Sequence, residues 1–143
     1  MSSAATRRLN GMDWKLELIV VPVADIDRAK AFYLGLDWDL IVDHRAGEDF
    51  RVVQLNPPAS ACAIALMKNP GAAGSLGGLH LVVSDIDAAH GHLSAKGADP
   101  SGPFHFEEGR QVDGPDTERQ DYNSFLSFDD PDGNSWLVQE VHR

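Results

Sequence analysis

The chain carries the same sequence pattern twice, 60 positions apart. Residues 17–33 read ELIVVPVADIDRAKAFY, and residues 77–93 read GGLHLVVSDIDAAHGHL. The tripeptide Asp25–Asp27 recurs as Asp85–Asp87, with the intervening isoleucine in the same place. A repeat of this length that occurs only twice indicates a duplicated half-domain rather than a solenoid array. The sequence therefore predicts one unit made of two similar modules.

Each copy of the repeat predicts a buried strand followed by a helix. The apolar runs Leu16–Val23 and Leu79–Val83 are short and rich in branched residues, as buried strands are. Asp25 and Asp85 follow these runs, and an aspartate at that position accepts hydrogen bonds from free N–H groups at a helix start. The predicted helices, each with the glycine expected at its left-handed end, are Ile26–Leu34 with Gly35 and Ile86–Lys96 with Gly97.

After each helix the pattern becomes strand-like three times. The expected strands are Leu36–Asp43, Phe50–Asn56 and Ala61–Lys68 in the first half, and Gly102–Glu107, Asn123–Asp129 and Ser135–Val141 in the second. The glycine-containing segment Asn69–Gly78 is expected to be a flexible linker between the modules. Trp14, Trp38 and Trp136 belong to apolar runs and are expected to anchor packing, with Trp136 facing the helices. The fold class is therefore α+β, with a βαβββ unit present twice.

In these features the chain resembles the vicinal oxygen chelate superfamily, also called the glyoxalase/bleomycin resistance/dioxygenase fold. The resemblance is carried by the βαβββ repeat, by the opening LELIVVPVADIDRAKAFY and by FDDPDGNSWLVQE at Phe128–Glu140. It covers Trp14 to Val141 and implies two modules in a pseudo-twofold arrangement, forming a cup-shaped mixed β-sheet with helices on its outer face. Members include isomerases, epimerases, ring-opening dioxygenases, thiol transferases acting on antibiotics and drug-sequestering proteins. The fold alone therefore does not choose the activity.

Length and composition fit one domain. A chain of 143 residues with 43% apolar content can bury a single core. We expect a flexible N-terminal tail at residues 1–13 and one domain at residues 14–143, with module one at about 14–69 and module two at about 77–142. Because proteins of the family usually dimerise, the resemblance also implies a homodimer.

The charge of the chain limits its partners. A net charge of −10 argues against nucleic acid and anionic membranes, since phosphate groups are bound by clustered lysine and arginine. No apolar run approaches the length of a transmembrane helix, and no apolar segment typical of a signal peptide follows the N-terminal arginines. We expect a cytoplasmic protein whose partner is a small molecule, without nucleic acid or membrane binding.

In metal-dependent relatives, the resemblance implies four ligands on the first and last strands of the modules, usually His, Gln or Glu. Such ligands must be nitrogen or oxygen donors. Counted from the two helix starts and from the DPDG turn, the corresponding residues are Leu18, Ala65, Gly78 and Leu137, none of which has a donor side chain. A register slip of one residue would instead turn Glu17 inward. We therefore expect no cofactor and no metal of the family type, while a divalent metal at relocated ligands stays open.

The same register predicts a largely apolar cup. The predicted ligand-binding residues are Leu18, Val20, Ala65, Met67, Gly78, His80, Leu137 and Gln139 on strands, with Tyr122 as an aromatic group near the cup. Phe106 is a second stacking candidate, although aromatic residues in strands usually belong to the core. Such a lining suits a ligand held by shape and a few hydrogen bonds. The sequence favours a metal-independent protein that binds an apolar or aromatic metabolite or antibiotic.

The alternative is a glyoxalase-like lyase or isomerase, or a dioxygenase. Its predicted catalytic residues are His80, His105 and Glu107, acting as acid and base or, with Glu108, as a relocated metal site. A lone histidine in a strand is more often a hydrogen-bonded residue of the sheet, and this is the favoured alternative for His80. The acidic stretch 107–121 is either a lid or a solvated loop. Convergence of His80 with His105 and Glu107 would favour catalysis, and their separation would favour binding.

Overall fold

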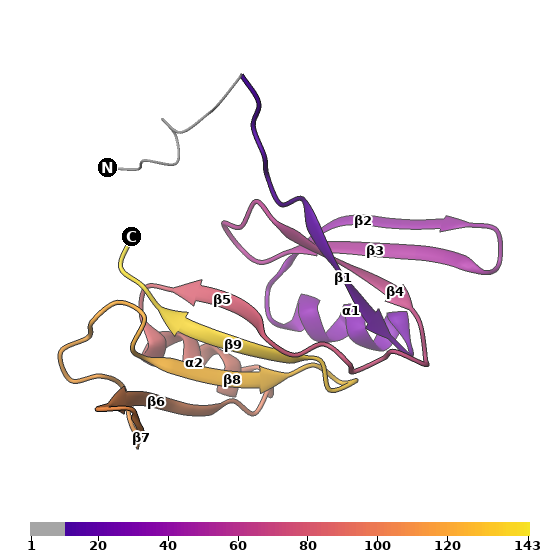
Figure 1. Ribbon diagram of the computed structural model, residues 1–143. Coiled ribbons are helices and arrows are strands. Elements are labelled where there is room, and N and C mark those ends of the chain that lie inside the picture. The colour runs from indigo at the N-terminus through magenta and orange to yellow at the C-terminus, as the bar shows by residue number, and fades with distance from the viewer. Residues whose placement is uncertain (1–10) are drawn as a thin grey trace.

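The computed structural model describes residues 11–143 and has the predicted α+β fold of two βαβββ modules, consistent with modules that form a cup (Figure 1). Of the tail expected at residues 1–13, residues 1–10 lie outside the described residues. Module one contains β1 (Leu18–Val23), α1 (Ile26–Gly35), β2 (Asp39–Ala46), β3 (Phe50–Asn56) and β4 (Ala63–Lys68). Module two contains β5 (Leu79–Val83), α2 (Ile86–Ala95), β6 (Ser101–Glu107), β7 (Arg110–Asp113), β8 (Phe125–Asp129) and β9 (Ser135–Glu140).

The strands form two mixed sheets with corresponding registers. Sheet one has the order β1-β4-β3-β2, and sheet two has the order β5-β9-β8-β6-β7. β1 runs parallel to β4 with Val20 opposite Ala65, and β5 runs parallel to β9 with His80 opposite Leu137. Val20 and His80 are 60 positions apart, so the sequence repeat is also a repeat of register. Among the described residues, β1 pairs only with β4 and β5 only with β9, which leaves each sheet one free edge at its first strand.

Each helix covers one face of its own sheet, and the two modules share one hydrophobic core (Figure 1). Val21 and Val23 of β1 and Trp136 of β9 belong to that core. Trp38 is also buried there, so the predicted packing role is confirmed for Trp38 and Trp136. It is wrong for Trp14, which is exposed in the segment before β1. No helix in residues 11–143 is long and apolar enough to cross a membrane.

The end of α1 differs from the prediction. Gly35 is the last helical residue, and the left-handed residue is Asp37 with φ of 69°. The equivalent position of module two, 60 residues later, is Gly97 with φ of 81°. Asp is one of the few residues with a side chain that tolerates this conformation. Because Leu36 and Asp37 complete the helix end, β2 begins at Asp39 rather than at the predicted Leu36.

Module two contains one strand that the sequence pattern did not indicate. β7 pairs antiparallel with β6, and the residues between them, Glu108 and Gly109, both have positive φ. Two such residues form the type I′ turn that suits the twist of a hairpin. The hairpin takes up the first part of the acidic stretch and leaves a shorter loop at residues 114–124.

The linker between the modules is packed against the turn between β8 and β9. Gly74 has φ of 80°, and a Cβ atom there would lie 2.1 Å from the carbonyl oxygen of Asp132. The N–H of Leu76 donates to Asn134 Oδ1 at 3.1 Å. The expectation of a flexible linker is therefore wrong, since glycine here permits a close backbone contact instead.

The same turn joins the two modules through buried hydrogen bonds. The Tyr33 hydroxyl of α1 donates to Asp130 at 2.9 Å, and Asn134 Nδ2 donates to the Pro22 carbonyl at 3.0 Å. The indole N–H of Trp136 donates to the Tyr33 hydroxyl at 3.0 Å. Burial, followed by the negative charge of Asp130, raises the pKa of Tyr33 well above its usual range. The DPDG sequence is thus a structural junction, and Tyr33 remains a neutral donor.

Candidate functional site

We define the open face as the side of the two sheets opposite the helices. Because side chains alternate along a strand, the core residues Val21 and Val23 place Leu18 and Val20 of β1 on the open face. Ala65 and Met67 of β4 lie on the same face, since Ile64 and Leu66 belong to the core. Strands β1 and β4 therefore have the predicted register. The four predicted ligand-binding residues of these strands lie together on the open face.

The predicted residues of module two lie on the open face of sheet two. His80 of β5 is exposed, and Leu137 and Gln139 of β9 are partly exposed beside it. Gly78 directly precedes β5. Val82 lies opposite Gln139 in the β5–β9 pair and is also exposed.

The open face of sheet two also holds an aromatic cluster, formed by Phe104, Phe106 and Phe125. The Phe104 and Phe125 rings are stacked with centroids 5.5 Å apart, and Phe106 lies 5.8 Å from each. Phe125 pairs with Gln139 across β8 and β9, so the rings adjoin a side-chain amide. The sequence did not predict this cluster, because aromatic residues in strands usually belong to a core. The sequence feature that could have indicated it is the alternation of Phe104 and Phe106 about His105.

His105 and Glu107 form a pair on the other side of the sheet. His105 is buried, with Nδ1 2.7 Å from the Gly114 carbonyl oxygen and Nε2 2.7 Å from Glu107 Oε2. The hydrogen bond to Glu107, followed by that to Gly114, raises the pKa of His105 above its ordinary value.

His80 is far from this pair. Its Nδ1 atom contacts the Gly78 carbonyl oxygen at 2.5 Å, and its side chain lies on the open face of β5. In the strand order, β9 and β8 separate β5 from β6, which puts about 14 Å between the two strands. The three predicted catalytic residues therefore split into His80 on one face and the His105–Glu107 pair on the other.

Tyr122 lies in the loop before β8. Its N–H donates to the Glu140 carbonyl oxygen at 2.9 Å, and Arg143 Nη2 donates to its hydroxyl at 3.2 Å. The side chain is exposed, and its ring makes no contact with the aromatic cluster among the ring pairs of the described residues.

Arg119 fixes the acidic loop to the body of module two. It donates to the buried Glu140 at 3.0 and 3.2 Å and to Asp87 of α2 at 3.1 Å. The hydrogen bond from Arg119 lowers the pKa of Glu140 against the opposing effect of burial. Asp116 holds the loop internally by accepting the N–H groups of Glu118 and Gln120. The loop is therefore attached to the helix and to β9 and does not extend into solvent as a free segment.

The positions that the resemblance assigns to the family's metal ligands are Leu18, Ala65, Gly78 and Leu137. These residues do not fit a metal, because none has a donor side chain. In the part of the chain that the structure describes, no three His, Cys, Asp or Glu side chains come close enough to hold a metal ion.

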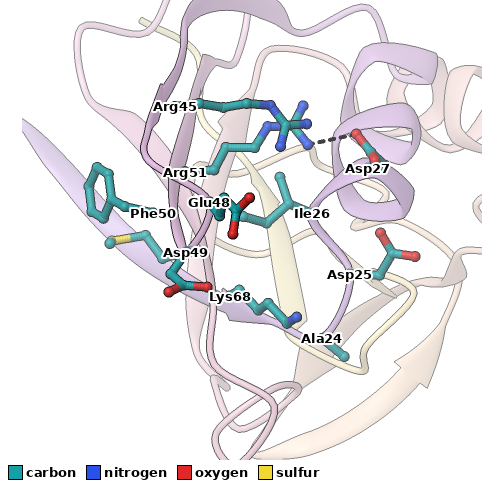
Figure 2. A pocket seen from close by; sticks show the side chains of 11 residues that line it. Ala24, Asp25, Ile26, Asp27, Arg45, Glu48, Asp49, Phe50, Arg51 and Lys68 are labelled. Atoms are coloured by element: carbon teal, nitrogen blue, oxygen red, sulfur yellow. Dashed lines mark hydrogen bonds and ion pairs between the residues drawn. The ribbon is translucent and has the colours of Figure 1, made fainter.

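A hollow of about 450 Å³ lies between the N-terminal end of α1 and the β2–β3 hairpin (Figure 2). Figure 2 shows Arg51 reaching from the hairpin to Asp27 on the helix, a contact of 2.7 Å. Arg51 also donates twice to Asp43 at 2.9 Å, which lowers the pKa of that carboxyl far below its usual range. Both acidic and basic side chains line this hollow, so it does not match an apolar ligand.

A second hollow of about 350 Å³ lies on the helix side of sheet two, between α2 and the end of α1. Its walls include Trp38, Leu93 and Phe128, which are members of the shared core. It is a gap at the margin of the core, separated from the open face by sheet two.

Comparison with known proteins agrees with this geometry. A family model described as Glyoxalase/Bleomycin resistance protein/Dioxygenase superfamily matches residues 15–138. The structure of TnmS3, an antibiotic-binding protein from Streptomyces sp. CB03234, is similar at TM-score 0.69 and 27% identity, covering 90% of this chain and 96% of that one. A glyoxalase/bleomycin resistance protein from the same strain gives TM-score 0.67 and 29% identity, with 88% and 100% covered.

A bleomycin-binding protein solved in complex with bleomycin shares the fold at TM-score 0.61 and 16% identity, with 92% of this chain and 100% of that chain covered. The comparison with curated proteins gave no match. The family model covers most of the chain, and the paired βαβββ modules have the matching architecture. The chain belongs to the Glyoxalase/Bleomycin resistance protein/Dioxygenase superfamily.

Proposed function

We propose that this protein binds an apolar or aromatic small molecule, of the antibiotic or metabolite class, on the open face and without a metal at the family positions. The observation that carries the proposal is the cluster of Phe104, Phe106 and Phe125 beside the amide of Gln139. Small-molecule sites combine apolar and aromatic walls with a few polar groups that fix orientation. Phenylalanine rings 5.5 to 5.8 Å apart offer stacking surfaces to a planar ligand.

The similar structures support the same class of ligand. One of them is an antibiotic-binding protein at 27% identity over 90% of this chain. The chain's departure from the metal pattern at Leu18, Ala65, Gly78 and Leu137 removes the donors through which a metal would hold a substrate's oxygen atoms.

We further propose that a second copy of the chain completes the site. Within residues 11–143, the outer edges of β1 and β5 have no strand partner, and such edges readily pair with another chain. In a twofold dimer, β1 of one copy meets β5 of the other twice, which satisfies both edges and closes the assembly. At each of the two junctions, the open face of sheet one from one copy and the open face of sheet two from the other then form the walls of one cup. A single cysteine, Cys62, allows no internal disulfide, which fits a cytoplasmic location.

The separation of His80 from the His105–Glu107 pair supports binding over acid–base catalysis by these residues. A base and an acid must both reach the reacting atoms within hydrogen-bond distance. Residues on opposite faces of one sheet, about 14 Å apart along it, do not meet that condition.

Isothermal titration calorimetry tests the proposal with bleomycin, tetracycline and anilinonaphthalene sulfonate as probes, each in buffer containing EDTA. We expect binding of at least one probe, unchanged by the chelator. Phe125→Ala should weaken it about tenfold or more, since it removes a ring that contacts both other rings of the cluster. Leu34→Ala is the matched control, because Leu34 is an exposed apolar residue on α1, away from the open face.

Equal binding by wild type and Phe125→Ala would place the ligand elsewhere. Loss of binding in EDTA, with recovery on adding a divalent metal, would contradict the metal-free site. Failure of all three probes to bind would contradict the proposal as well.

A further inference from the structure

The two modules carry opposite charges at one matching position beside their helices. In the β1–β4 pair, Val23 lies opposite Lys68, and in the β5–β9 pair, Val83 lies opposite Glu140. Val23 and Val83 are equivalent in the repeat, 60 positions apart. Lys68 therefore stands in module one where Glu140 stands in module two.

In module two, this position supplies a carboxylate to the start of α2. Glu140 is 1% exposed, and its Oε1 atom accepts the N–H of Ile86, the first helical residue, at 2.8 Å. Arg119 donates to the same carboxylate and to Asp87 in the first turn. The free N–H groups and the positive end of the helix dipole favour a negative group here. Glu140 thus completes the start of α2 from within the chain.

Module one has the corresponding donors but no carboxylate between them. Arg51 donates to Asp27 in the first turn of α1 at 2.7 Å, which matches the arginine–aspartate contact of module two. Within residues 11–143, the N–H of Ile26, the first residue of α1, meets no acceptor. Lys68 adds a cation where module two has the acceptor. These residues all line the hollow of about 450 Å³ beside the β2–β3 hairpin.

The acidic residues at the helix start do not exclude a further carboxylate from this hollow. The tripeptide Asp25–Asp27 of module one recurs as Asp85–Asp87 in module two. There, Arg119 lies 3.0 Å from Glu140, 3.1 Å from the second aspartate of the tripeptide and 3.6 Å from the first. Module two therefore accommodates a carboxylate next to the same two aspartates.

The hairpin side of the hollow carries further charges. Arg45, Glu48 and Asp49 line it from the β2–β3 hairpin, and Figure 2 shows them around the hollow together with Lys68. In the part of the chain that the structure describes, neither Glu48 nor Asp49 nor Lys68 forms a salt bridge. Acids without a salt bridge favour a cationic group, whereas the helix start favours an anionic one. A molecule that carries both groups matches the hollow better than a simple anion or cation.

We propose that this hollow binds a small zwitterion of the amino-acid class, whose carboxylate takes the place that a glutamate fills in module two. The ligand carboxylate accepts the Ile26 N–H and a remaining N–H of Arg51, and it pairs with Lys68. The cationic group of the ligand faces Glu48 and Asp49. A volume of about 450 Å³ is in the range of small-molecule pockets.

This site goes beyond the proposed function. Its lining residues all belong to module one, whereas the aromatic cluster belongs to module two. Met67 is the one lining residue that is also a predicted ligand-binding residue of the open face. The two sites also differ in ligand chemistry, so different molecules test them.

Isothermal titration calorimetry of the full chain tests the inference with three molecules. These are L-lysine, cadaverine, which lacks the carboxylate, and hexanoate, which lacks the cationic groups. We expect L-lysine to bind at least about tenfold more tightly than either of the other two, because each of them leaves one set of charges in the hollow unpaired.

A substitution that copies module two gives the sharpest variant. Lys68→Glu places a carboxylate at the position of Glu140, so it should weaken L-lysine binding at least about 30-fold by occupying the same donors. It should also raise the urea midpoint of unfolding without ligand, since the new carboxylate accepts the Ile26 N–H. Lys15→Glu makes the same charge change outside the hollow and should alter the affinity less than about threefold.

Each contrary outcome overturns the inference. Failure of L-lysine to bind does so, as does equal binding of L-lysine and cadaverine or of L-lysine and hexanoate. Unchanged affinity in Lys68→Glu places the ligand elsewhere, and a lowered unfolding midpoint in that variant shows that its position does not correspond to that of Glu140. The apolar probes of the proposed function should bind Lys68→Glu as they bind wild type, so either site can fail while the other stands.

Discussion

At the scale of single residues, the junction between the modules depends on one hydroxyl group. Tyr33 donates to Asp130 and accepts from Trp136, with all three residues buried. Tyr33→Phe removes the hydroxyl and leaves the Trp136 indole N–H without that acceptor. We expect a loss of about 1 to 3 kcal/mol in the free energy of unfolding, measured by urea denaturation.

The control for this change is Tyr122→Phe, which removes an exposed hydroxyl. It should alter stability by less than about 0.5 kcal/mol. If both substitutions change the free energy of unfolding equally, the buried hydrogen bonds of Tyr33 do not stabilise the junction.

His105 gives a second prediction at this scale, on pH dependence. Its pKa is raised in the folded protein, chiefly by Glu107, so protonation of the ring stabilises the fold. That stabilisation is fully present below the unfolded pKa of about 6.5 and is lost as pH rises through the folded pKa. Urea unfolding between about pH 6 and 9 should show this decline.

Glu107→Gln should flatten the decline, because the glutamine keeps the shape but not the charge. NMR titration of the His105 ring should show its pKa moving down toward the ordinary value. Glu108→Gln, one residue away in the β6–β7 turn, should leave both readouts unchanged. An unchanged His105 pKa in Glu107→Gln would show that the carboxylate is not its cause.

At the scale of elements, two glycines, one within α2 and one just after it, have opposite requirements. Gly91 lies within the helix, has ordinary φ and has open space around an added Cβ atom, so Gly91→Ala should stabilise the protein by about 0.5 to 1 kcal/mol. Gly97 has φ of 81° after the helix, so Gly97→Ala should destabilise it by about 1 to 2 kcal/mol. Thermal unfolding of both variants checks the opposite signs, and a shared sign would contradict the assignment of the helix end.

The elements that the sequence predicted best are those with local signals. Asp25 and Asp85 accept helical N–H groups as expected, and both helices begin one residue later. The β7 strand was missed because its turn signal, Glu108–Gly109, uses a left-handed glutamate that no general preference indicates. The position of Gly74 against Asp132 was also missed, since it depends on two segments far apart in the chain.

At the scale of the whole molecule, the repeat and the family motifs predicted the fold and the side of each sheet on which the ligand-binding strand residues lie. They did not predict that His105 and Glu107 lie on the face opposite His80. Alternation about Val21, Ile64, Leu79 and Val138 was enough for the ligand-binding residues. It could not show that the rings of Phe104 and Phe125 stack, because that contact forms between strands whose pairing the sequence does not state. The prediction that Trp14 anchors packing was wrong, since an apolar run does not show whether its side chains pack against the rest of the chain.

The most direct test of the central claim is an NMR titration of isotope-labelled protein with whichever calorimetric probe binds, recorded with and without EDTA. The account predicts that the largest shifts fall on Val82, Phe106, Phe125 and Gln139 and are the same in both conditions. Shifts that concentrate instead on the charged hollow around Arg51, or on the hollow between α2 and α1, or that require a divalent metal, would contradict it.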